Sequence, residues 1–256
     1  MTFLVTIQCG TVCFKNLQAV LFDKDGTLAN SQDFLWNLGQ KRARLIDAQI
    51  PGVQEPLLMA FGLDGPVLNP SGMMAVGSRL ENEIAAAAYI AETGRDWIEA
   101  RSIARSAFQE ADRVFRRKAD HTPLFDEAIQ LLRSLAKTQV KVGILSADTT
   151  ANVQDFIERY ELGALVSLGM GTDAGPGKPD PTLFYQACVE LGVEPKAVLA
   201  IGDSAADGEM ARAAGAAGWI GVTWGWTPPI SLRGADALAA RFDDIQVFDE
   251  AVQVGG

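Results

Sequence analysis

Two carboxylates, two residues apart, follow a run of apolar residues near the start of the chain. The segment Asp23–Leu28 reads Asp-Lys-Asp-Gly-Thr-Leu and comes directly after Ala19–Phe22. Ionised carboxylates are costly to bury without partners, so stability does not explain this pair. In open α/β sheets, ligand chemistry gathers at the carboxyl ends of strands, where this pair lies. Gly26 allows a tight turn and Thr27 adds a hydroxyl beside the acids.

Three further motifs fall at the ends of predicted strands. Ser146 closes the apolar strand predicted over residues 140–145. Lys178 lies in the segment Gly177–Pro181, and the segment Gly202–Asp207 follows a strand predicted over residues 197–201. Because the carboxyl ends of parallel strands meet at one edge of a sheet, we expect these loops to open together.

The charges in these loops indicate a metal ion. Asp23, Asp25, Asp203 and Asp207 bring four negative charges to one edge, and Lys178 returns one positive charge. Carboxylates at close range cannot all remain ionised without compensation. Magnesium favours oxygen ligands, keeps several waters and takes few protein carboxylates, whereas zinc favours clustered His and Cys. The sequence therefore predicts a Mg²⁺ site.

The elements around these motifs predict an α/β fold. After Pro123, apolar strands alternate with helical segments, which indicates a doubly wound parallel sheet with a Rossmann-like core. Two β-prone runs within residues 3–14 predict a hairpin appended to this sheet. The predicted strands cover residues 19–22, 140–145, 165–168, 197–201 and 219–222, and the predicted helices cover residues 126–137, 148–160, 181–191 and about 204–214.

A different pattern fills the segment between the first strand and Pro123. Helical periodicity dominates from about residue 33 to residue 120, with helices predicted from residue 33 to about 49 and from 97 to about 118. No convincing strand is present there, and residues 62–78 are typical of loops with short helical turns. We therefore predict a separate all-helical domain at residues 30–122, inserted into a core domain of residues 1–29 and 123–256.

Composition narrows the class of protein further. The 256 residues carry a formal net charge of −10, which argues against non-specific nucleic-acid binding. Cys9, Cys13 and Cys188 have no zinc or disulfide spacing, so we expect free thiols and a cytoplasmic protein. Lys15 is the first basic residue, so no secretory signal is expected. Glycines and prolines interrupt the uncharged residues 213–232, so we expect no membrane helix.

The four motifs, in this order, resemble those of the haloacid dehalogenase superfamily of aspartate-nucleophile phosphatases. The resemblance covers residues 19–28 and about 123–225. It implies that Asp23 is the nucleophile that forms an aspartyl-phosphate, and that Asp25 protonates the leaving alkoxide and then activates water. It also implies that Ser146 hydrogen-bonds the phosphoryl group and that Lys178 steadies the nucleophile and the transferring charge.

The same resemblance implies ligand and substrate contacts. Asp203 is similar to a magnesium ligand of the family, alongside Asp23 and the backbone carbonyl of Asp25. Asp207 is similar to a second acid that binds the metal or orients its waters. The inserted domain at residues 30–122 lies where the family has a helical cap domain, which implies that the remaining residues form the catalytic core. A cap can act as a lid that contacts the leaving group, so specificity is expected there. The residues that we expect to bind substrate are Gly26, Thr27, Ala147 and Arg79.

The predicted function is a magnesium-dependent phosphatase with a phosphoglycolate-phosphatase-like layout, acting on a small phosphorylated metabolite as a monomer or homodimer. A phosphomutase with the same site remains an alternative, as does a non-enzymatic phosphoacceptor. A haloacid dehalogenase is disfavoured, because halide needs no proton to leave and Asp25 is present. Strand alternation is expected to point Lys24 away from the nucleophile, without effect on the mechanism. Trp224 and Trp226 are expected to anchor the core or a loop, with a place at the edge of the active-site cleft as the alternative.

Overall fold

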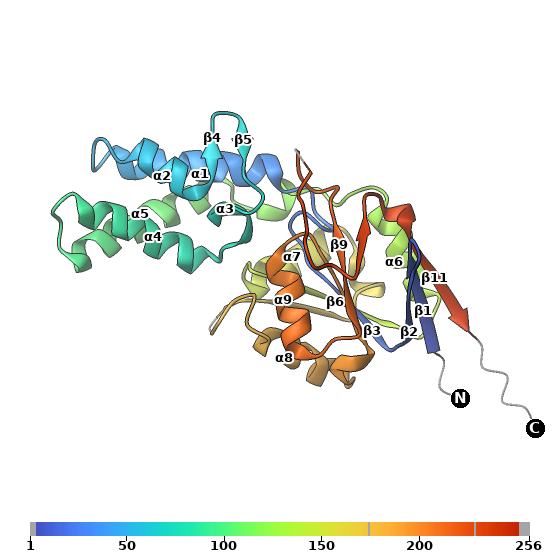
Figure 1. The fold of residues 1–256 in the computed structure, drawn as a ribbon. Coiled ribbons are helices and arrows are strands. Elements are labelled where there is room, and N and C mark those ends of the chain that lie inside the picture. The colour runs from blue at the N-terminus through green and yellow to red at the C-terminus, as the bar shows by residue number, and fades with distance from the viewer. Residues whose placement is uncertain (1–3, 174, 228, 251–256) are drawn as a thin grey trace, which may run out of the picture. The chain divides into compact units, whose positions relative to one another are not determined.

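The computed structural model describes residues 4–173, 175–227 and 229–250, and the chain divides into two compact units (Figure 1). The first, here called the sheet unit, comprises Met1–Asn30 and Pro123–Gly256. The second, here called the helical unit, comprises Ser31–Thr122. The chain leaves the sheet unit after Asn30 and returns to it at Pro123. These two residues are neighbours, since the amide of Asn30 donates to the carbonyl of Pro123 (2.8 Å).

A six-stranded parallel sheet forms the centre of the sheet unit (Figure 1). The strand order is β10-β9-β8-β3-β6-β7, so the first strand of the sheet in sequence, β3, lies in its interior. The side chains of β3 and β8 are buried throughout, as expected for strands that are covered on both faces. The strands are β3 (Ala19–Phe22), β6 (Lys141–Ser146), β7 (Leu168–Gly171), β8 (Val198–Gly202), β9 (Gly218–Val222) and β10 (Ala237–Ala239).

Helices connect the parallel strands and complete the core. The helices α8 and α9 pack against one face of the sheet, where Ala19, Leu21 and Trp219 join a shared apolar cluster. The predicted doubly wound α/β fold is confirmed. The helices are α6 (Ala128–Ala136), α7 (Thr150–Arg159), α8 (Thr182–Leu191) and α9 (Ala205–Ala214), with single 3₁₀ turns η2 (Leu162–Ala164), η3 (Pro195–Ala197) and η4 (Phe242–Asp244).

The predicted N-terminal hairpin is confirmed over its described residues, but it belongs to a second sheet. Strands β1 (Leu4–Cys9) and β2 (Val12–Leu17) pair antiparallel, and β11 (Ile245–Glu250) pairs with the other edge of β1. Residue 3 of the expected hairpin lies outside the described residues. The third strand was not predicted, because its partner lies more than two hundred residues away in the sequence. All three cysteines are free, as expected.

The helical unit contains five α-helices and one small hairpin within its described residues. Strands β4 (Leu63–Asp64) and β5 (Val67–Leu68) were not predicted. They form because Gly62 and Gly65 adopt positive φ angles, which lets the chain reverse and bury Leu63 and Leu68. The helices are α1 (Gln32–Asp47), α2 (Gln54–Phe61), α3 (Met73–Val76), α4 (Arg79–Glu92) and α5 (Trp97–Val114), followed by the 3₁₀ turn η1 (Lys118–Asp120).

Two predicted element boundaries are wrong for local reasons. The strand expected at residues 165–168 begins instead at Leu168, because a 3₁₀ turn occupies residues 162–164. The cap of α7 is Thr149, whose hydroxyl accepts from the amide of Asn152, rather than Asp148. The carboxylate of Asp148 instead faces Lys24.

Among the described residues, no helix is both long enough and apolar enough to cross a bilayer.

Candidate active site

Three adjacent parallel strands bring Asp23, Ser146 and Asp203 to one edge of the sheet. In the register, Phe22 of β3 pairs with Ile144 of β6 and with Ile201 of β8. The amide of Asp23 donates to the carbonyl of Ile201 (2.8 Å), which extends the strand pairing by one residue. The loops after β3, β6 and β8 therefore leave the sheet side by side, as the sequence predicts.

The ammonium of Lys178 joins these loops. Its Nζ lies 2.5 Å from Oδ1 of Asp23, 2.6 Å from Oδ1 of Asp207 and 2.9 Å from the carbonyl of Leu145. An ammonium has three hydrogens and no acceptor, so these three contacts use its full donor capacity. The acceptors come from the ends of β3 and β6 and from the first turn of α9. Lys178 therefore fixes the nucleophile candidate Asp23 against two other elements.

Burial makes the electrostatics of this cluster unusual. Burial raises the pKa of Asp23 to about 6, with Asp207 and Asp25 adding to the effect and Lys178 opposing it. Burial likewise raises the pKa of Asp203 well above its ordinary value, helped by the charges of Asp23 and Asp207. Burial alone would lower the pKa of Lys178, but the carboxylates of Asp207 and Asp23 outweigh it and raise that pKa. Lys178 therefore does not offset the raised pKa values of Asp23 and Asp203.

Asp207 has a structural role as well as its contact with Lys178. Its amide and the hydroxyl of Ser204 form a capping box at the start of α9, in which Oδ2 of Asp207 accepts from the amide of Ser204 (3.1 Å). Oδ2 also accepts from the hydroxyl of Ser204 (2.6 Å). The helix start therefore orients Asp207 so that its Oδ1 faces Lys178.

Asp203 accepts hydrogen bonds from two side chains, and neither contact was predicted from the sequence. The hydroxyl of Thr27 donates to its Oδ1 (2.9 Å), and the indole Nε1 of Trp226 donates to its Oδ2 (2.5 Å). Both Asp203 and Trp226 are 3% exposed. Trp226 is confirmed as a buried anchor, but its partner turns out to be a predicted metal ligand. The sequence signal was available in the Trp-Gly-Trp segment that follows strand β9.

That segment, here called the Trp loop (Thr223–Thr227), is fastened to the turn after β3. The indole Nε1 of Trp224 donates to the carbonyl of Thr27 (2.9 Å). Gly225 lies so close that a Cβ atom there would stand 1.9 Å from the carbonyl oxygen of Gly26. Gly26 itself has a φ of 86°, and a Cβ on it would stand 2.5 Å from Oδ2 of Asp203. Two glycines are therefore needed for the close approach that positions Asp203.

Of the remaining predicted residues, Ser146, Ala147 and Asp25 lie in the sheet unit and Arg79 lies in the helical unit. Ser146 is buried at the end of β6, its hydroxyl accepts from the amide of Asp148 (3.1 Å), and Ala147 lies between them. Oδ2 of Asp25 accepts from Nζ of Lys24 (2.7 Å).

Arg79 starts helix α4, and its guanidinium is engaged in ion pairs. It donates to Glu83 (2.7 Å) and to Asp112 (3.0 Å) within the helical unit. Glu83 is buried and also accepts from Arg105 (3.3 Å). These contacts give Arg79 a structural role, while its contact with substrate stays a prediction.

The candidate metal ligands fit a hard cation by their chemistry. Among the described residues, no three His, Cys, Asp or Glu side chains are already arranged to hold a metal ion. The candidate ligands are all oxygens, from Asp23, Asp203 and Asp207, with Asp25 beside them. Their carboxylates are directed at protein donors: Lys178, Thr27, Trp226 and Ser204. Burial is the main cause of the raised pKa values of Asp23 and Asp203, with the neighbouring acids adding to it, and a divalent cation held there would favour the ionised carboxylates.

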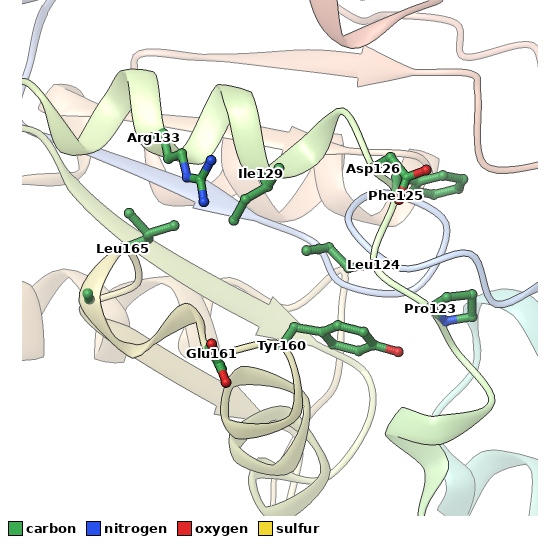
Figure 2. Close-up of a pocket in the computed structure, with 10 residues that line it drawn as sticks. Pro123, Leu124, Phe125, Asp126, Ile129, Arg133, Tyr160, Glu161 and Leu165 are labelled. Atoms are coloured by element: carbon green, nitrogen blue, oxygen red, sulfur yellow. The ribbon is translucent and has the colours of Figure 1, made fainter.

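A separate pocket of about 600 Å³ lies elsewhere in the sheet unit (Figure 2). Ile129 and Arg133 project from α6 toward Leu165 in Figure 2. None of the predicted site residues lines this pocket. The lining residues are Pro123, Leu124, Phe125, Asp126, Ile129, Arg133, Tyr160, Glu161, Ala164 and Leu165.

Sequence comparison identifies relatives of this chain. A sequence model described as haloacid dehalogenase-like hydrolase matches residues 17–215. The N-acetylmuramic acid 6-phosphate phosphatase of Pseudomonas putida is 29% identical over 201 residues, which cover 78% of this chain and 80% of that protein. The phosphoglycolate phosphatase of Photorhabdus laumondii is 26% identical over 239 residues, which cover 90% of this chain and 92% of that protein.

Solved structures share the fold. A crystal structure described as a predicted phosphoglycolate phosphatase from Haemophilus somnus has a TM-score of 0.65 at 22% identity, covering 89% of this chain and 96% of that one. A hydrolase of the same superfamily from Entamoeba histolytica has a TM-score of 0.62 at 22% identity, covering 90% and 96%. At this identity the structural likeness supports the fold alone.

The contact between the Trp loop and the turn after β3 can be tested with Gly225→Ala. The added Cβ meets a backbone oxygen that cannot move independently, so we expect a destabilisation of about 1–3 kcal/mol in urea unfolding. Gly163→Ala is the matched control, because a Cβ at Gly163 has no atom within 4 Å. Equal unfolding free energies for the two variants would contradict the close approach.

The raised pKa of Asp23 predicts a pH-dependent effect of Asp23→Asn on stability in metal-free buffer. A carboxyl whose pKa rises from 3.8 to about 6 on folding favours the folded state below pH 3.8, and this contribution is lost as the pH rises through 6. Asp23→Asn has no titrating group at this position, so its stability does not fall with pH for this reason. Relative to wild type, its unfolding free energy should therefore gain on the order of 2 kcal/mol between pH 4 and pH 8. A difference that stays constant with pH would refute the shift.

Proposed function

The chain belongs to the haloacid dehalogenase-like hydrolase family and is a phosphoric monoester hydrolase of that type, and we propose that it hydrolyses a small phosphorylated metabolite through a phosphorylated Asp23. The observation that carries the proposal is the Lys178 ammonium, held 2.5 Å from Asp23 at the carboxyl edge of the sheet. A carboxylate fixed beside a cation is arranged to attack a phosphate whose own charge would otherwise repel it.

In the first step, a carboxylate oxygen of Asp23 forms a bond to phosphorus. The bond from phosphorus to the ester oxygen breaks, and its electron pair goes to that oxygen. The carboxyl group of Asp25 gives its proton to the same oxygen, so that the substrate leaves as a neutral alcohol. Asp23 then carries the phosphoryl group as an acyl phosphate.

In the second step, water replaces Asp23 on phosphorus. The Asp25 carboxylate accepts a proton from the water as its oxygen bonds to phosphorus. The bond between phosphorus and Asp23 breaks, and the electron pair returns to the Asp23 carboxylate. Inorganic phosphate leaves, and both aspartates regain their starting protonation states.

Other residues of the edge support these steps. Lys178 keeps its proton and stays paired with Asp23 and Asp207, so it offsets the charge of the transferring group. We assign Mg²⁺ to Asp23, Asp203, Asp207 and the carbonyl of Asp25, where it would neutralise phosphate charge. The residues proposed to contact the phosphoryl group are Ser146, Gly26, Thr27 and Ala147.

The names of the relatives support the proposed substrate class. Both relatives bear the names of phosphatases for small metabolites, one a phosphorylated amino sugar and one a phosphorylated two-carbon acid. We propose a substrate of that size, with phosphoglycolate-like molecules first. We also propose that the helical unit, with Arg79, acts as the cap domain that selects the leaving group.

The proposed reaction can be tested by measuring phosphate release from a panel of phosphorylated metabolites with and without Mg²⁺. We expect release that requires the cation and falls by at least about 1000-fold in Asp23→Asn, because an amide cannot replace the nucleophile. Asp126→Asn, an exposed acid of the sheet unit, is the control for removing one charge.

Three results would contradict the proposal. Full turnover by Asp23→Asn would exclude the covalent route. Turnover that depends strongly on a bisphosphate activator and yields an isomer instead of free phosphate would indicate a phosphomutase. Absence of release from every member, with a long-lived phosphorylated protein, would indicate a phosphoacceptor.

A further inference from the structure

Lys24, the middle residue of Asp-Lys-Asp, places a buried cation against Asp25. The lysine is 1% exposed. Its Nζ lies 2.7 Å from Oδ2 of Asp25 and 3.6 Å from Oδ2 of Asp148. Sequence reasoning expected Lys24 to point away from the nucleophile and to leave the mechanism unaffected. The long side chain nevertheless brings its ammonium to the other acid of the motif.

The pairing of β3 with β6 explains why these three side chains meet. The two strands are adjacent and parallel, so the segment that starts at Asp23 runs beside the loop that follows Ser146. Asp148 is held in that loop, because its Oδ1 accepts from the amide of Thr149 (2.8 Å) and from the side-chain amide of Asn152 (2.7 Å). Lys24 therefore links Asp25 to the start of helix α7.

Stability alone gives little reason for a lysine at this position. Burying an ammonium and its partners has a desolvation cost that the ion pairs offset only in part. The ring of Phe156, whose centroid lies 5.6 Å from Nζ, adds one cation–π contact, which is a small gain beside the cost of burying the charge. A buried cation that touches the proposed general acid is better explained by its effect on that acid.

We propose that Lys24 is a positioning residue that holds the Asp25 carboxyl for proton transfer and so determines how well the enzyme expels a leaving group that needs a proton. This inference rests on the proposed phosphatase function. An ammonium can only donate, so Oδ2 of Asp25 accepts from Lys24 and the transferable proton is carried on Oδ1. That proton moves to the ester oxygen as the bond to phosphorus breaks, and Lys24 keeps its own protons throughout.

The leaving group separates this role from a general structural one. An alkoxide needs a proton in order to leave, whereas p-nitrophenolate is a stable anion that leaves without one. The ratio kcat/KM covers the steps from free enzyme to the first irreversible step, here the release of the alcohol. Loss of acid positioning should therefore reduce kcat/KM for an alkyl phosphate and spare kcat/KM for p-nitrophenyl phosphate.

The test compares Lys24→Met and Asp148→Asn with wild type on phosphoglycolate, or the best alkyl phosphate of the panel, and on p-nitrophenyl phosphate. For Lys24→Met we expect kcat/KM on the alkyl phosphate to fall by at least about 10-fold, with a change of less than about 3-fold on the aryl phosphate. Asp148→Asn should show the same selective fall in kcat/KM with a smaller fold-change, since it removes the charge that pairs with Lys24 and keeps the side-chain volume. Lys137→Met, which removes an exposed lysine of the same unit, should change neither.

Equal losses on both substrates, or no loss on either, would overturn the role of Lys24. So would an undiminished effect of Lys24→Met in an Asp25→Asn background, because Lys24 is proposed to act through Asp25. If Lys24→Met does not fold, as judged by circular dichroism, Asp148→Asn decides by the same criteria. Failure of the proposed function is distinguishable, because wild type would then release phosphate from neither substrate, and the role of Lys24 would fall with it.

Discussion

The ammonium of Lys178 is the contact on which the rest of the site depends. It connects the ends of two strands and the first turn of a helix by donating to Asp23, Asp207 and the carbonyl of Leu145. These acceptors come from parts of the chain that are far apart in sequence, and the parallel sheet brings them together at its carboxyl edge. Without this cation, Asp23 and Asp207 would be neighbouring buried acids with no shared counter-charge, which is an arrangement that proteins avoid.

The site nevertheless has more acid than this one lysine can balance. The pKa values of Asp23 and Asp203 are both raised by burial, even though Lys178 contacts the first and two hydrogen-bond donors hold the second. Such a site stores an electrostatic cost in the folded protein, which a divalent cation would relieve. The surrounding scaffold has to keep these acids in place against their repulsion. The Trp loop does so through Trp226 on Asp203 and Trp224 on the carbonyl of Thr27.

Sequence reasoning predicted the parallel sheet, the ends of the strands that precede Asp23 and Asp203, and the grouping of Asp23, Lys178 and Asp207. Each of these depends on local patterns and on the rule that parallel strands share an edge. It could not predict features set by contacts between distant segments. The pairing of β11 with β1 and the contact of Trp226 with Asp203 are of this kind. The contact of Lys24 with Asp25 was missed for a different reason. Strand alternation indicates the side on which a side chain leaves the backbone, whereas the flexible four-carbon stem determines where its ammonium lies.

The most direct test of the central claim is to locate the phosphoryl group on the chain. Trypsin cleaves after Lys24 and so separates Asp23, the only acid of residues 16–24, from Asp25 in the next peptide. Enzyme quenched during turnover and treated with borohydride, which reduces an acyl phosphate to an alcohol, would be analysed by mass spectrometry. We predict homoserine in place of aspartate within residues 16–24. Reduction at Asp25, or unmodified peptides during confirmed turnover, would contradict nucleophilic attack by Asp23.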